Sequence, residues 1–365
     1  LEVKYQVVKS RQIFSEALKV RPDWTYLADY YVLYFPTTES VTAAAADYAA
    51  DPNILKAFPS TRVHADTVTP DDAHFTDQYG LTNIKAPQAW DRTTGSASIV
   101  IAVIDTGIDS NHPDLAASRI DSRWKNIINP SLPPEDDYGH GTEVTGVLGA
   151  TTSNEIGVAG VDWQAKILPI KALDNTGNGA IEDIIAGIAY ASACGADIIN
   201  MSFGQYLPDS LLEQACLDAY NNGAVMIVSA GNGNTSQESY PAAYTTVVAV
   251  GAVDQDDKRS IWSGTDPFTG RRQASNYGPW VDVMAPGTSI WSTDFSGGYS
   301  GSNHGTSLSA PFVSGLAALV KAVNPSLSKA QIMAKIINTA DNVDSLNPGF
   351  AGWLGSGRIN AFRAD

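Results

Sequence analysis

Cysteine is nearly absent from this 365-residue chain, which contains only Cys194 and Cys216. A disulfide-based scaffold and a multi-cysteine metal site are therefore excluded. Both cysteines lie in segments whose pattern favours helices. They can form one disulfide if those two helices are neighbours, and otherwise they are packed thiols, so the sequence leaves both states open.

Basic residues and long apolar runs are also scarce. Lysine and arginine total 23 against 39 for aspartate and glutamate, a net charge of −16 that repels nucleic-acid phosphates and anionic membranes. The most apolar stretches, such as Ser98–Ile104 and Ala224–Ala230, fall short of the ~18 residues that a membrane-spanning helix needs. Since 44% of the residues are apolar, we expect a soluble globular monomer with no nucleic-acid or membrane partner.

The first 66 residues differ in sequence pattern from the rest, and they predict a small α+β module. Its expected strands are Tyr26–Pro36 and Ile54–Phe58, and its expected helices are Arg11–Val20 and Glu39–Ala50. Residues 67–78 are polar and are expected to form a linker and the start of the main domain. The chain opens at Leu1 without a basic-then-apolar leader, so we expect any targeting segment either to have been removed or never to have been part of this sequence.

From residue 79 to 365, apolar runs alternate with helical patterns. This alternation is typical of α/β proteins, and we expect a doubly wound, mainly parallel sheet with helices on both faces. The expected strands are Ser98–Asp105, Ala165–Ile170, Asp197–Met201, Ala224–Ala230 and Thr245–Val253. The expected helices are His140–Ala150, Ile181–Gly195, Ser210–Asn222, Thr306–Val323 and Ser328–Ala340, with capping boxes at Ser210 and Ser328.

Three chemically useful residues lie where an expected strand ends or a helix begins. Asp105 ends a buried strand, His140 opens a helix between two glycines, and Ser307 lies in the first turn of a long helix. Nucleophilic acyl transfer requires these residue types: a hydroxyl nucleophile, a base of near-neutral pKa and a carboxylate that fixes the base's tautomer. Taken singly, each is more simply a strand-end acid, a core histidine or a helix-start serine. Together they predict a hydrolytic site.

A fourth residue, Asn232, follows another apolar strand. Its amide could donate to the oxyanion of a tetrahedral intermediate, beside the backbone N–H of Ser307. The simpler interpretation is a turn residue among neighbouring glycines. Its position directly after the strand favours the oxyanion role.

The order Asp, His, Asn, Ser of these four segments resembles the subtilisin family of serine endopeptidases. The segments are Val103-Ile104-Asp105-Thr106-Gly107, Gly139-His140-Gly141-Thr142, Ser229-Ala230-Gly231-Asn232 and Gly305-Thr306-Ser307-Leu308-Ser309-Ala310-Pro311. The resemblance extends from Tyr79 to Ala361 and implies a subtilisin-like fold, secretion, and peptide hydrolysis through an acyl-enzyme. The chain departs from the family's pattern at Glu143, where relatives usually carry a second histidine.

By the same resemblance, residues 1–66 are similar to the propeptide of such enzymes. We expect this module to act as an intramolecular inhibitor, with Val63–Asp66 in the cleft as a product-like strand, and to be released in the following linker. The simpler interpretation is a permanent N-terminal domain.

The resemblance also implies how a polypeptide substrate would bind. Ser202-Phe203-Gly204 and Gly177-Asn178-Gly179 would pair with an extended peptide as neighbouring strands. The P1 side chain would lie near Ser202–Gly204, Ala230–Asn232 and Ser239, and the lack of charge there favours apolar or mixed P1 residues. Both glycine segments could instead be ordinary loops.

Calcium is the cofactor that the resemblance implies. Asp72, Asp114 and Asn154 match side-chain ligands of the family's tight site, and Thr152, Ile156 and Val158 match its carbonyl ligands, a hard-oxygen set that suits Ca²⁺. Otherwise Asp114 caps a turn and Asp72 is linker charge.

Two other functions compete with that of a secreted endopeptidase. One is a catalytically silenced fold, blocked by its N-terminal module and used for binding. The other is peptide ligation or cyclisation through the same acyl-enzyme. Intact Asp105, His140, Asn232 and Ser307 argue against silencing, and no sequence feature tests ligation.

Overall fold

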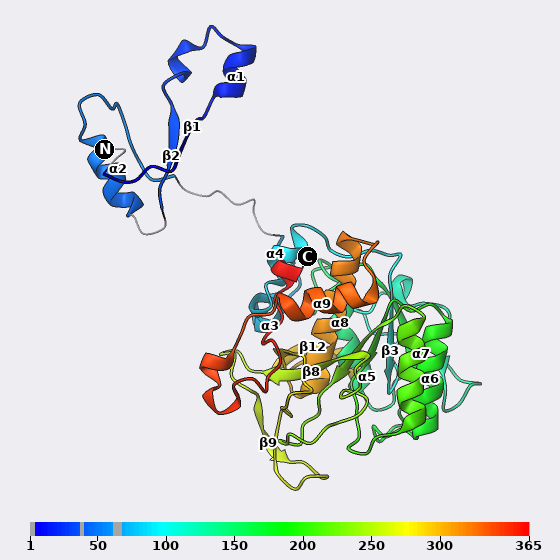
Figure 1. The fold of residues 1–365 in the computed structure, drawn as a ribbon. Helices are drawn as coiled ribbons and strands as arrows, with labels where there is room; N and C mark the ends of the chain where they lie inside the picture. Colours follow the sequence, from blue (N-terminus) through cyan, green and yellow to red (C-terminus); the bar gives the residue numbers. More distant parts are fainter. Residues whose placement is uncertain (1–3, 37–39, 61–67, 365) are drawn as a thin grey trace. The chain divides into compact units, whose positions relative to one another are not determined.

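A computed structural model of the chain describes residues 4–36, 40–60 and 68–364 (Figure 1). The chain divides into two compact units, Leu1–Asp66 and Thr67–Asp365. The expected strand Val63–Asp66 lies outside the described residues.

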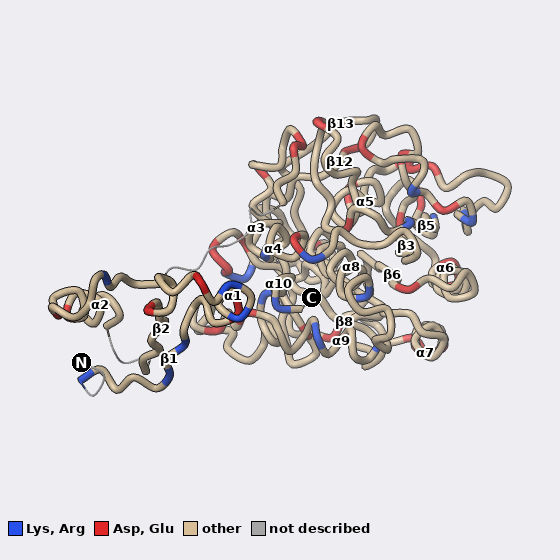
Figure 2. Tube along the Cα trace, turned by 90° about the horizontal axis from the view of Figure 1, so that it is seen from above, with Lys and Arg blue, Asp and Glu red and all other residues tan. Residues whose placement is uncertain are grey.

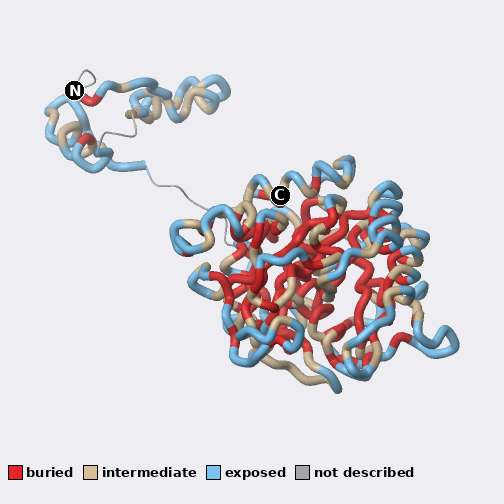
Figure 3. Tube along the Cα trace, turned by 60° about the horizontal axis from the view of Figure 1, so that its bottom comes forward, coloured by how far each residue is buried: buried red, intermediate tan, exposed pale blue. Residues whose placement is uncertain are grey.

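The smaller unit contains one antiparallel strand pair and two helices. Strand β1 (Lys9–Gln12) pairs with β2 (Tyr31–Tyr34), and the helices are α1 (Ser15–Val20) and α2 (Val41–Ala49). Among its described residues only Tyr5 and Ala44 are buried, whereas buried residues fill the larger unit (Figure 3). A unit of this size with so small a core has little hydrophobic stabilisation of its own.

Several sequence predictions for this unit are wrong. Residues 54–58 form no strand: Ile54 closes a turn on Asp51, and Leu55 and Phe58 are exposed, with no partner strand described beside them. The expected helix Arg11–Val20 begins only at Ser15, because the residues before it pair with β2. The polar sequence of β1 gives no strand signal, since its side chains are almost all exposed.

The larger unit is built on a seven-stranded parallel sheet in the order β11-β8-β7-β6-β3-β5-β4. Its strands are β3 (Val100–Asp105), β4 (Lys125–Asn126), β5 (Lys166–Lys171), β6 (Ile198–Met201), β7 (Val225–Ser229), β8 (Val247–Val253) and β11 (Val283–Pro286). Two antiparallel pairs lie outside this sheet, β9 (Ile261–Thr265) with β10 (Arg272–Ala274) and β12 (Ile290–Asp294) with β13 (Gly298–Asn303).

Helices cover both faces of the sheet, which confirms the predicted fold class (Figure 1). One face packs on α5 (His140–Gly149), α8 (Thr306–Val323) and α9 (Lys329–Asn338), and the other on α6 (Ile181–Ala193) and α7 (Ser210–Asn221). The short helices α3 (Tyr79–Asn83), α4 (Ala86–Trp90) and α10 (Ala361–Ala364) complete the set of described α-helices. Strands buried on both faces are nearly all apolar, which is why their sequence signal is strong.

Ser328 and Gln331 form the predicted capping box of α9, but α7 is capped by Asp209, whose carboxylate accepts from Leu211 N and Leu212 N. Cys194 and Cys216 are both free.

Helix α8 does have the length and apolar composition of a membrane-spanning segment, contrary to expectation, but 78% of it is buried, as in a core helix.

Charge is spread over the larger unit rather than gathered. Figure 2 shows Asp and Glu scattered along its loops, interspersed with fewer Lys and Arg.

Candidate active site

The carboxyl end of β3 and the start of α5 bring Asp105 and His140 together. Asp105 is fully buried at the end of its strand, and its Oδ1 lies 2.7 Å from His140 Nδ1. The backbone N–H of Thr106 donates to the same oxygen at 2.7 Å. The His140 side chain is 22% exposed. This arrangement fixes the imidazole with its Nδ1 toward the carboxylate and leaves Nε2 for a reacting group.

Asp136 holds the loop that leads into His140. Its carboxylate accepts from the N–H groups of Tyr138, Gly139 and Thr142 and from the Thr142 hydroxyl. Burial works to raise the pKa of Asp136, but these hydrogen bonds hold it below the usual range. Sequence analysis missed this role, although an acid just before a helix start is a recognisable anchor for free N–H groups.

A second missed residue joins the loops of Asp105 and His140. Lys171, in register with Asp105 on the neighbouring strand, is buried. Its ammonium donates to the carbonyl oxygen of Thr106 at 2.5 Å and pairs with Asp137 at 2.6 Å. The sequence signal that could have identified Lys171 is a lysine at the end of an otherwise apolar strand.

Ser307 lies in the first turn of α8 and forms a reciprocal pair with Ser202. Its Oγ donates to the carbonyl oxygen of Ser202 at 3.0 Å, and Ser202 Oγ donates to the carbonyl oxygen of Ser307 at 2.8 Å. Buried Asn200 in turn donates to Ser202 Oγ at 3.0 Å. In the described part of the chain no hydrogen bond joins Ser307 Oγ to His140, so only the aspartate–histidine half of the expected triad is hydrogen-bonded here.

Asn232 lies beside the start of α8 and is held in one orientation. Its Oδ1 accepts from the N–H and the hydroxyl of Thr306, both at 2.9 Å, so its Nδ2 is left free to donate elsewhere. Gly305 has a φ of +135°, and a β-carbon there would lie 3.2 Å from Asn232 Nδ2. The glycine therefore keeps the space in front of this amide open. Together with the Ser307 N–H, the amide offers two donors at a helix N-terminus, where an anion is favoured.

Of the segments expected to bind substrate, some lie close to Ser307 and others do not. Ser202 contacts Ser307 directly, and Ser239 lies between the neighbouring segments: β-carbons on Gly204 and Gly231 would stand 2.7 and 3.6 Å from Ser239 Oγ. These three segments thus meet beside Asn232. Phe203 is half-buried.

Residues 177–179 belong to a closed loop away from these contacts. Asp174 accepts from the N–H groups of Thr176 and Asn178, and its own N–H donates to Asn178 O at 2.7 Å. Gly177, with a φ of +74°, lies against the exposed ring of Tyr138. The described contacts bring no residue of 177–179 to Ser307.

Carboxylates surround His140 and determine its charge. Burial works to lower the pKa of His140, but the charge and hydrogen bond of Asp105, with smaller effects of Glu143 and Asp136, raise it to about 9. Burial raises the pKa of Glu143 to about 7, partly offset by His140 and reinforced by Asp294. The site therefore favours the imidazolium at neutral pH.

Asp72, Asp114 and residues 152–158 form a buried, oxygen-rich site. Asp72 Oδ1 is buried without a hydrogen-bond partner, and burial raises the pKa of Asp114 to about 6. In the described residues no hydrogen bond ends on the carbonyl oxygens of Thr152, Ile156 or Val158. Asn154 currently donates its Nδ2 to Asp114 Oδ1 at 2.8 Å.

Two close carboxylates, one of which has an unpaired oxygen at Asp72 Oδ1, fit a divalent hard cation, which would relieve their repulsion. No group of three or more His, Cys, Asp or Glu side chains gathers among the described residues. A cation here would depend on amide and carbonyl oxygens as well.

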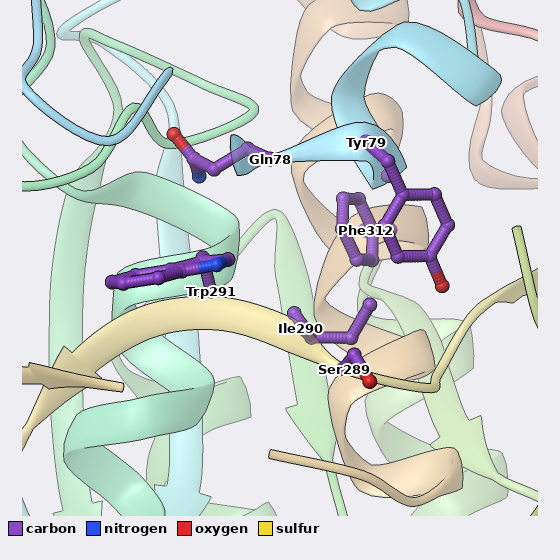
Figure 4. Close-up of a pocket in the computed structure, with 7 residues that line it drawn as sticks. Gln78, Tyr79, Ser289, Ile290, Trp291 and Phe312 are labelled. Atoms are coloured by element: carbon purple, nitrogen blue, oxygen red, sulfur yellow. The ribbon is translucent and has the colours of Figure 1, made fainter. Parts of the chain in front are cut away.

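A small cavity lies elsewhere, among Gln78, Tyr79, Ile290, Trp291 and Phe312 (Figure 4). It has room for about one water molecule and includes none of the residues predicted for catalysis. It is therefore no candidate for a peptide site.

Comparison with known proteins identifies a matching family and similar proteases over most of the chain. The family model described as Subtilase family matches residues 96–357. Thermitase of Thermoactinomyces vulgaris is 40% identical over 297 residues, covering 81% of this chain and 99% of thermitase. Subtilisin E of Bacillus subtilis is 36% identical over 286 residues, covering 77% and 69% of the two chains.

A solved structure is also similar. A protease of Pseudoalteromonas arctica superposes with a TM-score of 0.71 at 30% identity, covering 81% of this chain and 98% of its own. The matched family region lies wholly within the larger unit.

Proposed function

The chain belongs to the subtilase family and is a subtilisin-like serine endopeptidase, and on that premise we propose that Asp105, His140 and Ser307 are its catalytic triad. The observation that carries this assignment is the 2.7 Å contact between buried Asp105 and His140 Nδ1. Polypeptides are its substrates, as the family implies.

In the proposed reaction Ser307 Oγ attacks the scissile carbonyl while His140 Nε2 takes its proton. The Ser307 hydroxyl must first leave the carbonyl oxygen of Ser202, where it now donates. Asn232 Nδ2 and the Ser307 N–H then stabilise the oxyanion. His140 returns the proton to the leaving amine, and water releases the acyl group by the same path.

Hydrolysis by the Ser307→Ala variant tests the assignment. We expect no peptidase activity with an unchanged circular dichroism spectrum, because alanine fits a helix start and only the nucleophilic oxygen is lost. Activity retained in the variant would remove Ser307 from the mechanism. A wild-type protein that cleaves no peptide would favour a silenced binding module, and joined rather than hydrolysed products would favour a ligase.

For the substrate, we propose an extended peptide that pairs with Ser202–Gly204 and residues 177–179. Ser239 and Ala230–Asn232 flank its P1 side chain. The meeting of 204, 231 and 239 beside Asn232 supports an uncharged P1 site that takes apolar or mixed side chains.

For the cofactor, we propose one structural Ca²⁺ held by Asp72, Asp114, Asn154 and the carbonyls of Thr152, Ile156 and Val158. The unpaired oxygen of Asp72 and the free carbonyls support this ligand set. The ion would neutralise two buried carboxylates and tie the start of the larger unit to the 152–158 loop.

For the smaller unit, we propose an inhibitory propeptide role in a secreted zymogen. The small number of buried residues among those described in this unit, and its exposed Leu55 and Phe58, support a unit that needs another surface for stability. Incubation of the purified protein with calcium should yield a stable fragment that begins between residues 64 and 70, with a rise in activity. A fully active protein whose N-terminus is still Leu1 would show that residues 1–66 are neither removed nor inhibitory.

A further inference from the structure

Asn232 lies on a short loop, residues 230–235, that follows the end of β7. Gly231 has a φ of +96° and Asn234 a φ of +52°, so the backbone turns sharply on both sides of Asn232. On the side of α8, Gly231 N donates to Thr306 Oγ1 at 3.0 Å. Thr306 orients the Asn232 amide, but the position of that amide also depends on what holds the backbone of the loop.

The side chain of Asn276 joins the two ends of this loop. Asn276 is fully buried, its Nδ2 donates to Ala230 O at 2.9 Å, and its Oδ1 accepts from Thr235 N at 3.2 Å. Its own backbone N–H donates to Gly231 O at 2.8 Å. Within the described part of the chain, Ala230 O and Thr235 N have no other hydrogen-bond partner. Asn276 is therefore the side chain that satisfies both ends of the loop.

The Asn276 amide is held in one orientation. A β-carbon on Gly231 would lie 2.7 Å from its Nδ2, so the amide packs directly against the loop backbone. The second Nδ2 hydrogen donates to the hydroxyl of Tyr206 at 3.3 Å. Rotation of the amide by 180° would set its NH2 group against the N–H of Thr235 and its oxygen against the carbonyl of Ala230, and both bonds would be lost.

The backbone just before Asn276 holds the middle of the same loop. Ala274 N donates to Asn232 O, and Asn234 N donates to Ala274 O, both at 3.1 Å. The short segment 274–276 thus contacts the loop before, at and after Asn232. Because a buried amide is costly unless its polar groups are paired, the loop and Asn276 are stable in this arrangement only together.

We propose that Asn276 is a positioning residue for the reaction, which holds the 230–235 loop so that Asn232 Nδ2 points at the oxyanion. This inference rests on the proposed function, in which that amide stabilises the tetrahedral intermediate. A donor to the oxyanion acts only within hydrogen-bond distance of the transition state. A small displacement of the loop should therefore reduce the rate of the chemical step more than it weakens substrate binding.

The test begins with kcat and KM of Asn276→Ala, which leaves Ala230 O and Thr235 N without partners. We expect kcat to fall about tenfold and KM to change by less than about twofold. Asn276→Ser keeps a hydroxyl that can bond one of the two groups, so its loss of kcat should be smaller and of the same kind. This milder variant replaces Asn276→Ala if the latter does not fold.

The matched control is Asn347→Ala. Asn347 is also buried, its Oδ1 accepts from Arg259 N at 2.8 Å, and its Nδ2 donates to Val343 O at 2.8 Å. Its loss should lower Tm in the same way but leave kcat unchanged. An equal fall in kcat in the control, or failure of both Asn276 variants to fold, would show that Asn276 serves stability and would overturn the inference.

A double-mutant cycle with Asn232→Ala tests whether Asn276 acts through Asn232. Asn232→Ala should lower kcat more than Asn276→Ala does, and adding Asn276→Ala to it should cost less than about twofold, because the positioned donor is already gone. A full further loss, or a raised KM with unchanged kcat, would overturn the inference. If Asn232→Ala keeps its kcat, the proposed oxyanion role fails; if only the Asn276 variants keep theirs, this inference alone fails.

Discussion

The ionisation of His140 sets the pH range in which the site can work. The imidazole must be neutral to take the proton of Ser307, and its pKa is raised to about 9. We therefore expect kcat/KM to rise with pH and to level off only above a pH near this value.

Glu143 provides a test of that electrostatic account. Burial raises the pKa of Glu143 to about 7, so near pH 9 this residue is ionised and stabilises the imidazolium together with Asp105 and Asp136. Glu143→Gln removes one negative charge and should move the acid limb of kcat/KM to lower pH, which raises activity at neutral pH.

The measurement is kcat/KM from pH 6 to 11 against a control variant, Glu182→Gln, which changes an exposed acid on α6. An acid limb that stays in place in Glu143→Gln, or moves equally in the control, would show that Glu143 does not act on His140.

The sequence predicted which residues form this site, but it did not predict how their side chains are hydrogen-bonded. Asp105, His140, Asn232 and Ser307 stand out because each follows a strand or opens a helix. The donation of Ser307 Oγ to Ser202 depends on a rotamer that no pattern encodes. The role of Lys171 was hidden for another reason: its partners, Thr106 and Asp137, come from two other segments of the chain.

At the scale of elements, buried parallel strands were the easiest to predict. They are apolar runs between glycine-rich turns, so β3 and β5 to β8 lie within a few residues of expectation. Short or exposed strands were missed. β4 has two residues, β11 ends in a proline, and β9 buries only Trp262 among its five residues.

The start of α7 offers an element-scale prediction. Asp209 Oδ1 accepts from Leu211 N and Leu212 N at 2.8 and 2.9 Å, whereas Ser210 is the first helical residue. Asp209→Ala should lower the free energy of unfolding by about 1 kcal/mol, and Ser210→Ala should leave it nearly unchanged. Urea unfolding in a Ser307→Ala background avoids self-digestion. Equal losses in the two variants would restore the capping box that the sequence suggested.

At the scale of the whole molecule, calcium binding should couple to stability. An ion that binds only the native state stabilises it by mass action, by about 2.7 kcal/mol at one hundred times its Kd. In the Ser307→Ala background, a chelator should lower Tm, and Asp114→Ala should remove most of that response. Asp256→Ala, an exposed acid outside the site, serves as the control. A Tm that is unaffected by the chelator in the parent protein would contradict the calcium proposal.

The structure of the larger unit could be predicted from the sequence more completely than that of the smaller unit. The larger one buries long apolar strands and helices, so its pattern is redundant and its family is clear. The smaller one buries only Tyr5 and Ala44 among its described residues, so few positions constrain its pattern, and two of its predicted elements were misplaced or absent.

The most direct measurement of the central claim is covalent labelling of the active protein with an organophosphonate, followed by mass spectrometric mapping. After incubation with calcium, we expect one equivalent of label on Ser307, parallel loss of peptidase activity, and labelling slowed by the His140→Ala variant. Label on another residue, or full loss of activity with Ser307 unmodified, would contradict the triad.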